Sequence, residues 1–129
     1  MNLEIERQYW NEFFNSLSKR RYEWKTEIEV LDIERGDQIL SANLRLNGIT
    51  VEGTGKETTI DISVGENTER HQTHNIINPT RVAFLPAEGN HSDVVDIEEA
   101  NGTKTLIKFI EPVSLLVGFT EMSMAAAAG

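Results

Sequence analysis

Three histidines, His71, His74 and His91, carry the side chains best suited to acid–base chemistry or metal binding near neutral pH. His71 and His74 are three positions apart, a spacing that places two rings on one face of a helix but on opposite faces of a strand. The residues around them predict a strand, so we expect the pair to be split. A metal site would then require His91 and Asp93 to converge with one of them. We predict no metal ion and no catalytic set, and keep all four as candidate ligand-binding residues.

Two short motifs resemble functional loops but lack the necessary context. The Gly53-Thr54-Gly55-Lys56 segment resembles part of a phosphate-binding loop, yet Thr50 stands where the first glycine belongs and a strand pattern follows. The segment from Asp61 to Gly65 resembles half of a nucleophile elbow centred on a serine. It lacks the leading glycine and the following helix. Neither motif predicts an activity, and we expect no cofactor.

The densest basic group is Lys19, Arg20 and Arg21, with Lys25 close behind. Cations are common in the last turn of a helix, where the helix dipole and the free carbonyl groups favour positive charge. We favour that interpretation. The alternative is an anion-binding patch formed by these four residues.

The composition fits one acidic domain, with 129 residues, no cysteine and a net charge of −9. The absence of cysteine excludes disulfides and thiolate chemistry, and it suits the reducing cytoplasm, where we expect the protein. Nucleic-acid binding requires concentrated positive charge, so we predict no such partner unless the fold gathers the basic group with Arg45 and Arg81. The longest uncharged apolar stretch, Pro112 to Thr120, is too short to span a bilayer, and we expect no membrane partner.

The elements that position these residues begin with a helix, expected from Glu6 to Lys19. Trp10, Phe13, Phe14 and Leu17 recur at the spacing of one helical face. A stripe this apolar must dock on another element. We therefore predict that it covers a sheet and forms core, in preference to a binding groove.

From residue 26 onward, apolar and polar residues alternate with the period of half-buried strands. We predict strands over 26–30, 40–46, 60–64, 71–77, 81–85, 94–99 and 103–110, with 49–51 as an extension of the second or a further short strand. The Asn101-Gly102 pair predicts a two-residue hairpin turn. Such a turn places Glu99 opposite Lys104, and Ile97 opposite Leu106.

A helix followed by antiparallel strands predicts an α+β fold. We expect one domain over residues 1–111, in which the N-terminal amphipathic helix packs on a curved antiparallel sheet of six to seven strands. A small, partly closed β-barrel capped by the helix is the alternative. Residues 112–129 are expected to form a C-terminal segment and tail. We favour a homodimer, with the apolar run from Leu115 to Phe119 in its interface, over a monomer whose own core contains that run.

The order of these features is also shared with a known family. The matching residues are the helix face of Trp10, Phe13 and Phe14, then Trp24, Glu29-Val30-Leu31, Leu46-Asn47-Gly48-Ile49, the segment from Ile60 to Gly65, His74 with Ile76, Pro79-Thr80-Arg81-Val82, and the hairpin from Ile97 to Ile107. In this order the chain resembles domain-of-unknown-function family 5335, small bacterial proteins of about this size. The resemblance covers approximately residues 6 to 111. It implies a coherent fold and a bacterial cytoplasmic setting, and it implies no activity and no functional residue.

The absence of an activity motif leaves two main hypotheses. The first is a non-enzymatic interaction or regulatory module that binds an unknown protein or small-molecule partner through a sheet face or a strand edge. The second is a small metal-dependent or histidine-based hydrolase. It would use His71 or His74 with His91 and a nearby carboxylate.

Overall fold

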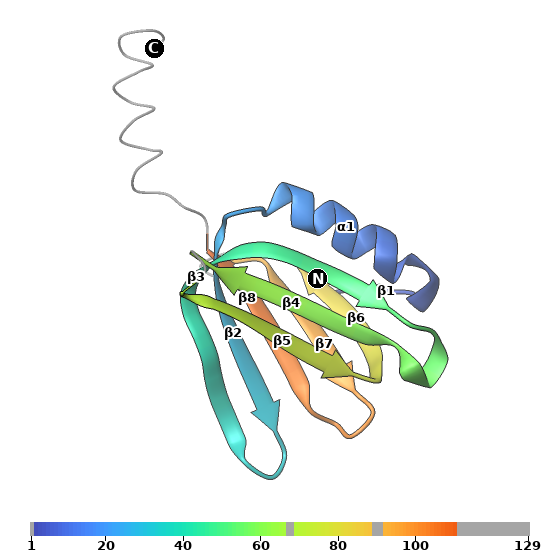
Figure 1. Ribbon diagram of the computed structural model, residues 1–129. Helices are drawn as coiled ribbons and strands as arrows, with labels where there is room; N and C mark the ends of the chain where they lie inside the picture. The colour runs from blue at the N-terminus through green and yellow to red at the C-terminus, as the bar shows by residue number, and fades with distance from the viewer. Residues whose placement is uncertain (1, 67–68, 89–91, 111–129) are drawn as a thin grey trace, which may run out of the picture.

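The computed structural model describes residues 2–66, 69–88 and 92–110. These ranges contain one α-helix, two short 3-10 helices and eight strands (Figure 1). In chain order the elements are β1 (Leu3–Ile5), η1 (Arg7–Tyr9), α1 (Trp10–Arg20), β2 (Lys25–Asp32), β3 (Gly36–Glu52), η2 (Gly55–Glu57), β4 (Thr59–Gly65), β5 (His71–Ile77), β6 (Pro79–Leu85), β7 (Val94–Glu99) and β8 (Lys104–Ile110). Within the described part, no helix has the length and apolarity that crossing a membrane requires.

All eight strands belong to one antiparallel sheet with the order β1-β6-β7-β8-β2-β3-β4-β5. The sheet does not close, because β1 and β5 form its two ends. The prediction of an antiparallel sheet with one N-terminal helix is confirmed, while the expected six to seven strands become eight. The additional strand is β1, whose three residues are too few to show an alternating pattern. Because the chain is mostly strand, the term α+β describes it only loosely.

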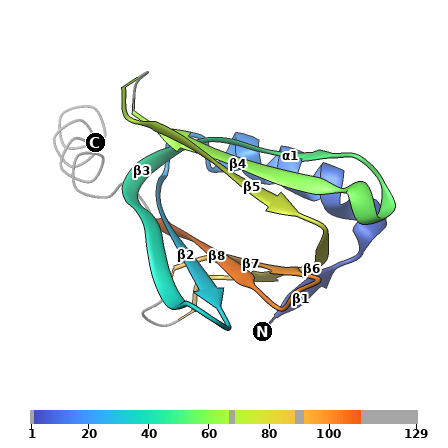
Figure 2. The ribbon, with the colours of Figure 1, turned by 60° about the horizontal axis from the view of Figure 1, so that its bottom comes forward.

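The long strand β3 turns this sheet into two layers (Figure 2). Its first half pairs with β2 and its second half pairs with β4. The register shifts along both ladders, and Asn43 has a positive φ of 62°. Such irregularities bend a strand. The predicted strands at 40–46 and 49–51 are therefore one bent strand, which passes from one layer to the other.

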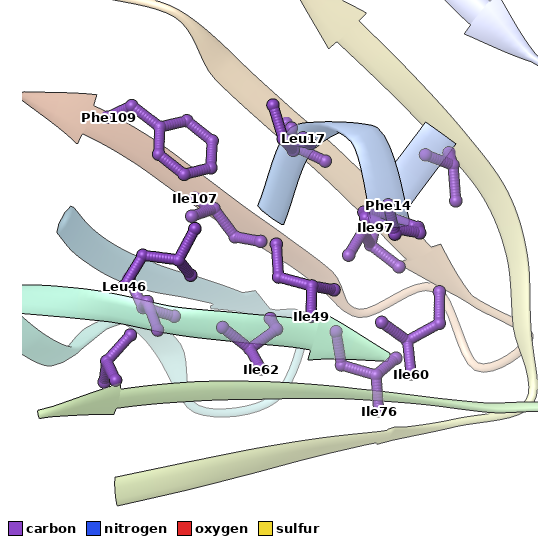
Figure 3. Close-up of a cluster of buried hydrophobic side chains, with 14 of the residues drawn as sticks. Phe14, Leu17, Leu46, Ile49, Ile60, Ile62, Ile76, Ile97, Ile107 and Phe109 are labelled. Carbon is purple, nitrogen blue, oxygen red and sulfur yellow. The ribbon is translucent and has the colours of Figure 1, made fainter. Parts of the chain in front are cut away.

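The core lies between the two layers and is completed by the helix. Trp10, Phe14 and Leu17 of α1 are buried, and Phe13 packs against them. Figure 3 shows Phe14 and Leu17 among isoleucines that come from both layers. The apolar stripe of the helix is thus core, as its spacing predicts.

The helix also covers a strand edge. The second half of β3 has β4 on one side only, and α1 lies along its other side (Figure 1). Ser18 of α1 donates its hydroxyl to the carbonyl of Ile49 (3.3 Å) and accepts the Ile49 N–H (2.9 Å). This serine therefore satisfies both backbone groups that Ile49 turns away from β4.

The β7–β8 hairpin differs from its predicted register. Glu98 lies opposite Lys104, and Ile97 lies opposite Thr105. The Glu99 N–H donates to the carbonyl of Thr103 (2.8 Å), so the loop holds three residues, 100–102, and Gly102 takes a φ of 92°. A three-residue loop that ends in a left-handed glycine is a common hairpin geometry. The expected pairing of Glu99 with Lys104 is wrong by one position.

Candidate functional site

The two neighbouring histidines lie on β5 and point to opposite sides of the sheet. His71 is exposed, and its Nε2 is 2.8 Å from the Ser63 hydroxyl on β4. His74 points between the layers, where its Nε2 is 3.5 Å from the hydroxyl of Thr105 on β8. Burial lowers the pKa of His74, because desolvation disfavours the charged ring. The two rings therefore cannot share a ligand, as the strand pattern predicts.

The two remaining candidate ligands are His91 and Asp93. His91 lies outside the described residues. Asp93 forms an ion pair with Arg21 and accepts the N–H of Ala87 (2.6 Å). Its carboxylate therefore holds the end of the helix against the loop that precedes β7. In the described ranges, no three His, Cys, Asp or Glu side chains gather in a way that could hold a metal ion.

The four basic residues of the candidate anion patch have different surroundings. Lys19 and Arg20 are exposed in the last turn of α1. Arg21, besides its bond to Asp93, stacks on Trp24 with 4.3 Å between the guanidinium carbon and the ring centroid. Lys25 begins β2, where it lies directly opposite Arg45 of β3.

Arg81, which a nucleic-acid site would have needed, lies in a separate ion-pair network. Its guanidinium contacts Glu4 (3.1 Å) and Glu98 (2.9 Å). The hydrogen bonds that Arg81 donates to these two carboxylates raise the pKa of Arg81. The positive charges of Arg21 and Arg81 are therefore both matched by carboxylates of the protein itself.

The pair of Ser63 and His71 is a contact that the sequence did not predict. Gly65 lies opposite His71, and Ser63 lies opposite Thr73, so the β4–β5 register brings the two side chains together. Ser63 lies within β4, away from any strand-to-helix turn, so the elbow geometry is absent here. Among the described residues, Ser63 is the one hydrogen-bond partner of the His71 ring.

Hydrogen bonds at both ends of the β4–β5 ladder determine which backbone groups of β5 are free. Glu66 donates its N–H to the carbonyl of Arg70, and Asn78 donates to the carbonyl of Thr58 (both 3.0 Å). Bonded and non-bonded residue pairs alternate in an antiparallel ladder. The alternation makes Gly65 and His71 a non-bonded pair. Every second residue of β5 after His71 also belongs to a non-bonded pair.

Four residues of β5 thus turn their N–H and C=O groups away from β4, toward the free edge of the sheet: His71, Thr73, Asn75 and Ile77. Of the described elements, only β4 pairs with β5. No backbone hydrogen bond to these four residues is present elsewhere in the described part. The edge is about 20 Å long, at roughly 3.3 Å per residue. It is a row of unsatisfied donors and acceptors that an extended chain can bind.

A cleft lies on the outer face of the sheet, near the start of β5. Its volume is about 740 Å³, within the range of small-molecule sites. It is lined by the two residues after the Arg21 helix cap, by two residues of β3, and by the β4–β5 end of the sheet: Tyr22, Glu23, Arg45, Asn47, Gly65, Glu66 and His71. The lining carries charges of both signs.

Sequence reasoning missed both the β5 edge and the cleft. The edge had a signal, because His71 to Ile77 contains no Asp, Glu, Lys or Arg. The cleft had none, since only the pairing of β2 with β3 brings Glu23 and Arg45 into one cleft.

The comparisons with known proteins give a family and no activity. The model of a family described as "Family of unknown function (DUF5335)" matches residues 1–117. No curated protein and no solved structure matches the chain.

Proposed function

Since the chain belongs to the DUF5335 family, whose function is unknown, we propose its function from the surface that the fold leaves open. The protein is a non-enzymatic interaction module that pairs with an extended segment of a partner protein along β5. The observation that carries this proposal is the character of the β5 edge. It is seven residues long, uncovered by any described element, and free of charged side chains.

The other free edges of the sheet are protected, and this contrast supports the proposal. Folded proteins blunt exposed strand edges with covering elements, charges or short strands, because a bare edge binds other chains. The second half of β3 is covered by α1 through Ser18. The edge strand β1 has three residues, and its Glu4 pairs with Arg81. The first half of β3 pairs with β2 only, and its ladder carries two register shifts, which also blunt an edge. The β5 edge has no covering element, and its ladder with β4 has no register shift.

The occupant that we propose is a neutral or basic extended segment. Strand addition draws its affinity from backbone hydrogen bonds, and side-chain pockets supply the specificity. With a net charge of −9, the protein attracts cationic partners and repels a second copy of itself. Self-pairing in a homodimer is the competing occupant. The apolar run for which we favoured a dimer lies outside the described residues.

We place this module in the cytoplasm of a bacterial cell. The support is the absence of cysteine, which fits a reducing compartment. The bacterial setting rests on the family resemblance seen in the sequence.

A proline at position 73 tests the proposal. The N–H of Thr73 points to the free edge, so Thr73→Pro removes one edge donor without removing a bond to β4. Thr73→Val is the matched control, because it keeps the N–H and the strand propensity. Each form is immobilised and used to capture proteins from a native cell extract. We expect the wild type and Thr73→Val to retain the same protein, and Thr73→Pro to lose it while keeping its thermal unfolding midpoint within a few degrees.

Hydrogen exchange then localises the contact. In the free protein, the amides of His71, Thr73, Asn75 and Ile77 should exchange rapidly, and the captured partner should protect them. Equal capture by the proline variant, or protection elsewhere on the chain, would contradict strand addition at β5. Capture of the same chain would identify the homodimer instead.

A histidine-based hydrolase is the second candidate, and the contact between Ser63 and His71 favours it. In such an enzyme the histidine takes the proton of the attacking hydroxyl. Hydrolysis of p-nitrophenyl acetate by the wild type would have to exceed that by Ser63→Ala and His71→Gln by about a hundredfold or more. Equal rates would exclude this candidate.

A further inference from the structure

The outer cleft contains two opposite charges without partners. Arg45 and Glu23 both line it, and neither makes an ion pair or a side-chain hydrogen bond with any described residue. The other carboxylate in the cleft, that of Glu66, pairs with Arg70 at 3.5 Å. The cleft therefore offers one uncompensated cation and one uncompensated anion.

A second cation stands beside Arg45. Lys25 lies directly opposite it in the β2–β3 ladder, so the two side chains share a face of the sheet. Like charges in directly opposed positions destabilise a strand pair. A bound carboxylate next to the two cations would offset this repulsion.

The backbone around Glu23 is held in place before any ligand binds. Its N–H donates to the carbonyl of Leu46 (2.9 Å), and its φ is 67°, in the left-handed region. The Leu46 N–H in turn donates to the carbonyl of Trp24 (2.9 Å). These bonds fix Tyr22 and Glu23 against β3, and pre-organised groups bind with a smaller loss of entropy. Tyr22 is 59% exposed, so its ring is open to a ligand.

We propose that this cleft binds a zwitterion of amino-acid or short-peptide size. Its carboxylate contacts Arg45, and its ammonium group contacts Glu23 and the face of the Tyr22 ring. The mixed charge of the lining disfavours the alternatives, since Glu23 repels a polyanion such as phosphate and Arg45 repels a simple cation. The inference does not rest on strand addition at β5, because neither Arg45 nor Glu23 belongs to that edge, although His71 belongs to both places.

Titrations followed by NMR test the proposal with the full chain labelled with ¹⁵N. The probes are glycine, triglycine, N-acetyltriglycine and triglycine amide, each up to about 10 mM, which suits the weak affinity of an open cleft. We expect triglycine to shift the amide resonances of Glu23, Arg45 and Asn47. Blocking either end of the peptide should weaken binding by about tenfold or more, because each block removes one charge-assisted contact. Glycine and triglycine distinguish a free amino acid from a peptide as the source of the zwitterion.

Two variants assign the two ends. Arg45→Gln should bind triglycine and triglycine amide equally, and Glu23→Gln should bind triglycine and its acetylated form equally. Arg35→Gln and Glu34→Gln are the matched controls, because they make the same charge changes in the β2–β3 turn. They should behave as the wild type. The absence of shifts with both glycine and triglycine, equal binding of the capped peptides to the wild type, or shifts located away from the cleft would each overturn the proposal.

Discussion

His71 and His74 show how strongly the environment separates two identical side chains three positions apart. His71 lies on the outer face, where it meets the Ser63 hydroxyl at 2.8 Å. His74 lies between the layers, where its ring nitrogen is 3.5 Å from Thr105. The alternation of a strand produces this separation, and it assigns His71 to the outer cleft and His74 to the boundary of the core.

The partly buried histidine, His74, predicts a pH dependence of folding. Burial lowers the pKa of His74 below its ordinary value of 6.5, so the unfolded chain binds more protons than the folded chain once the pH falls below that value. The contribution of the neutral ring is complete above the unfolded pKa and is lost as the pH falls through the folded pKa. We expect the free energy of unfolding to fall more steeply between about pH 7 and pH 5 in the wild type than in His74→Gln. Urea unfolding across this range measures both slopes, and identical slopes would contradict the buried position of the ring.

At the scale of elements, the helix α1 has two structural roles, and its amphipathic pattern indicates only the first. Its apolar face supplies Trp10, Phe14 and Leu17 to the core. Its polar residue Ser18 satisfies the backbone of Ile49 at the edge of β3. The first role is visible as a spacing of apolar residues. The second depends on which strand lies beside the helix.

Removing the Ser18 hydroxyl should therefore lower the free energy of unfolding. Ser18→Ala leaves the N–H and C=O of Ile49 without partners in a partly buried place, which costs about 1–3 kcal/mol. Ser16→Ala, on the exposed side of the same helix, shares the gain in helix propensity but loses no such bond. We expect the free energy of unfolding of the first variant to lie below that of the second by this amount. Equal values in guanidinium chloride titrations would show that the Ser18 bonds contribute nothing.

At the scale of the whole molecule, surface charge sets two effects against each other. The net charge of −9 favours expansion through self-repulsion. Local ion pairs on the outer face act in the opposite sense, among them those of Arg81 with Glu98 and Lys108 with Glu29 (3.1 Å). Exposed pairs of this kind contribute little, typically about 0–1 kcal/mol each.

Salt should therefore stabilise the protein. Raising the ionic strength from about 0.01 M to 0.15 M shortens the screening length from about 30 Å to 8 Å, which weakens the long-range repulsion more than it weakens the contact pairs. We expect the thermal unfolding midpoint at pH 7 to rise over this range. Sodium chloride is a suitable salt, because the described residues contain no cluster of His, Cys, Asp or Glu side chains that could hold a metal ion. A falling midpoint would show that the ion pairs outweigh the net repulsion.

The sequence alone determined the local structure of this protein. The spacing of Trp10, Phe13, Phe14 and Leu17 specified the helix and its buried face, because apolar residues must leave water together. The alternating pattern from residue 26 onward specified seven of the eight strands. The predictions that were wrong were local as well. The three residues of β1 are too few to show a period, and the β7–β8 loop has three residues where Asn101-Gly102 predicted a two-residue turn.

Only the tertiary structure decided which surfaces are open. The position of β5 at the end of the sheet follows from the strand order, and the placement of Glu23 and Arg45 in one cleft follows from the pairing of β2 with β3. These are contacts between residues far apart in the chain, and no periodicity encodes them. The physical reason is that hydrogen bonding between strands is nearly independent of side-chain identity. The global packing of the core selects the partner of each strand, and thereby selects which edges are left without a partner among the described residues.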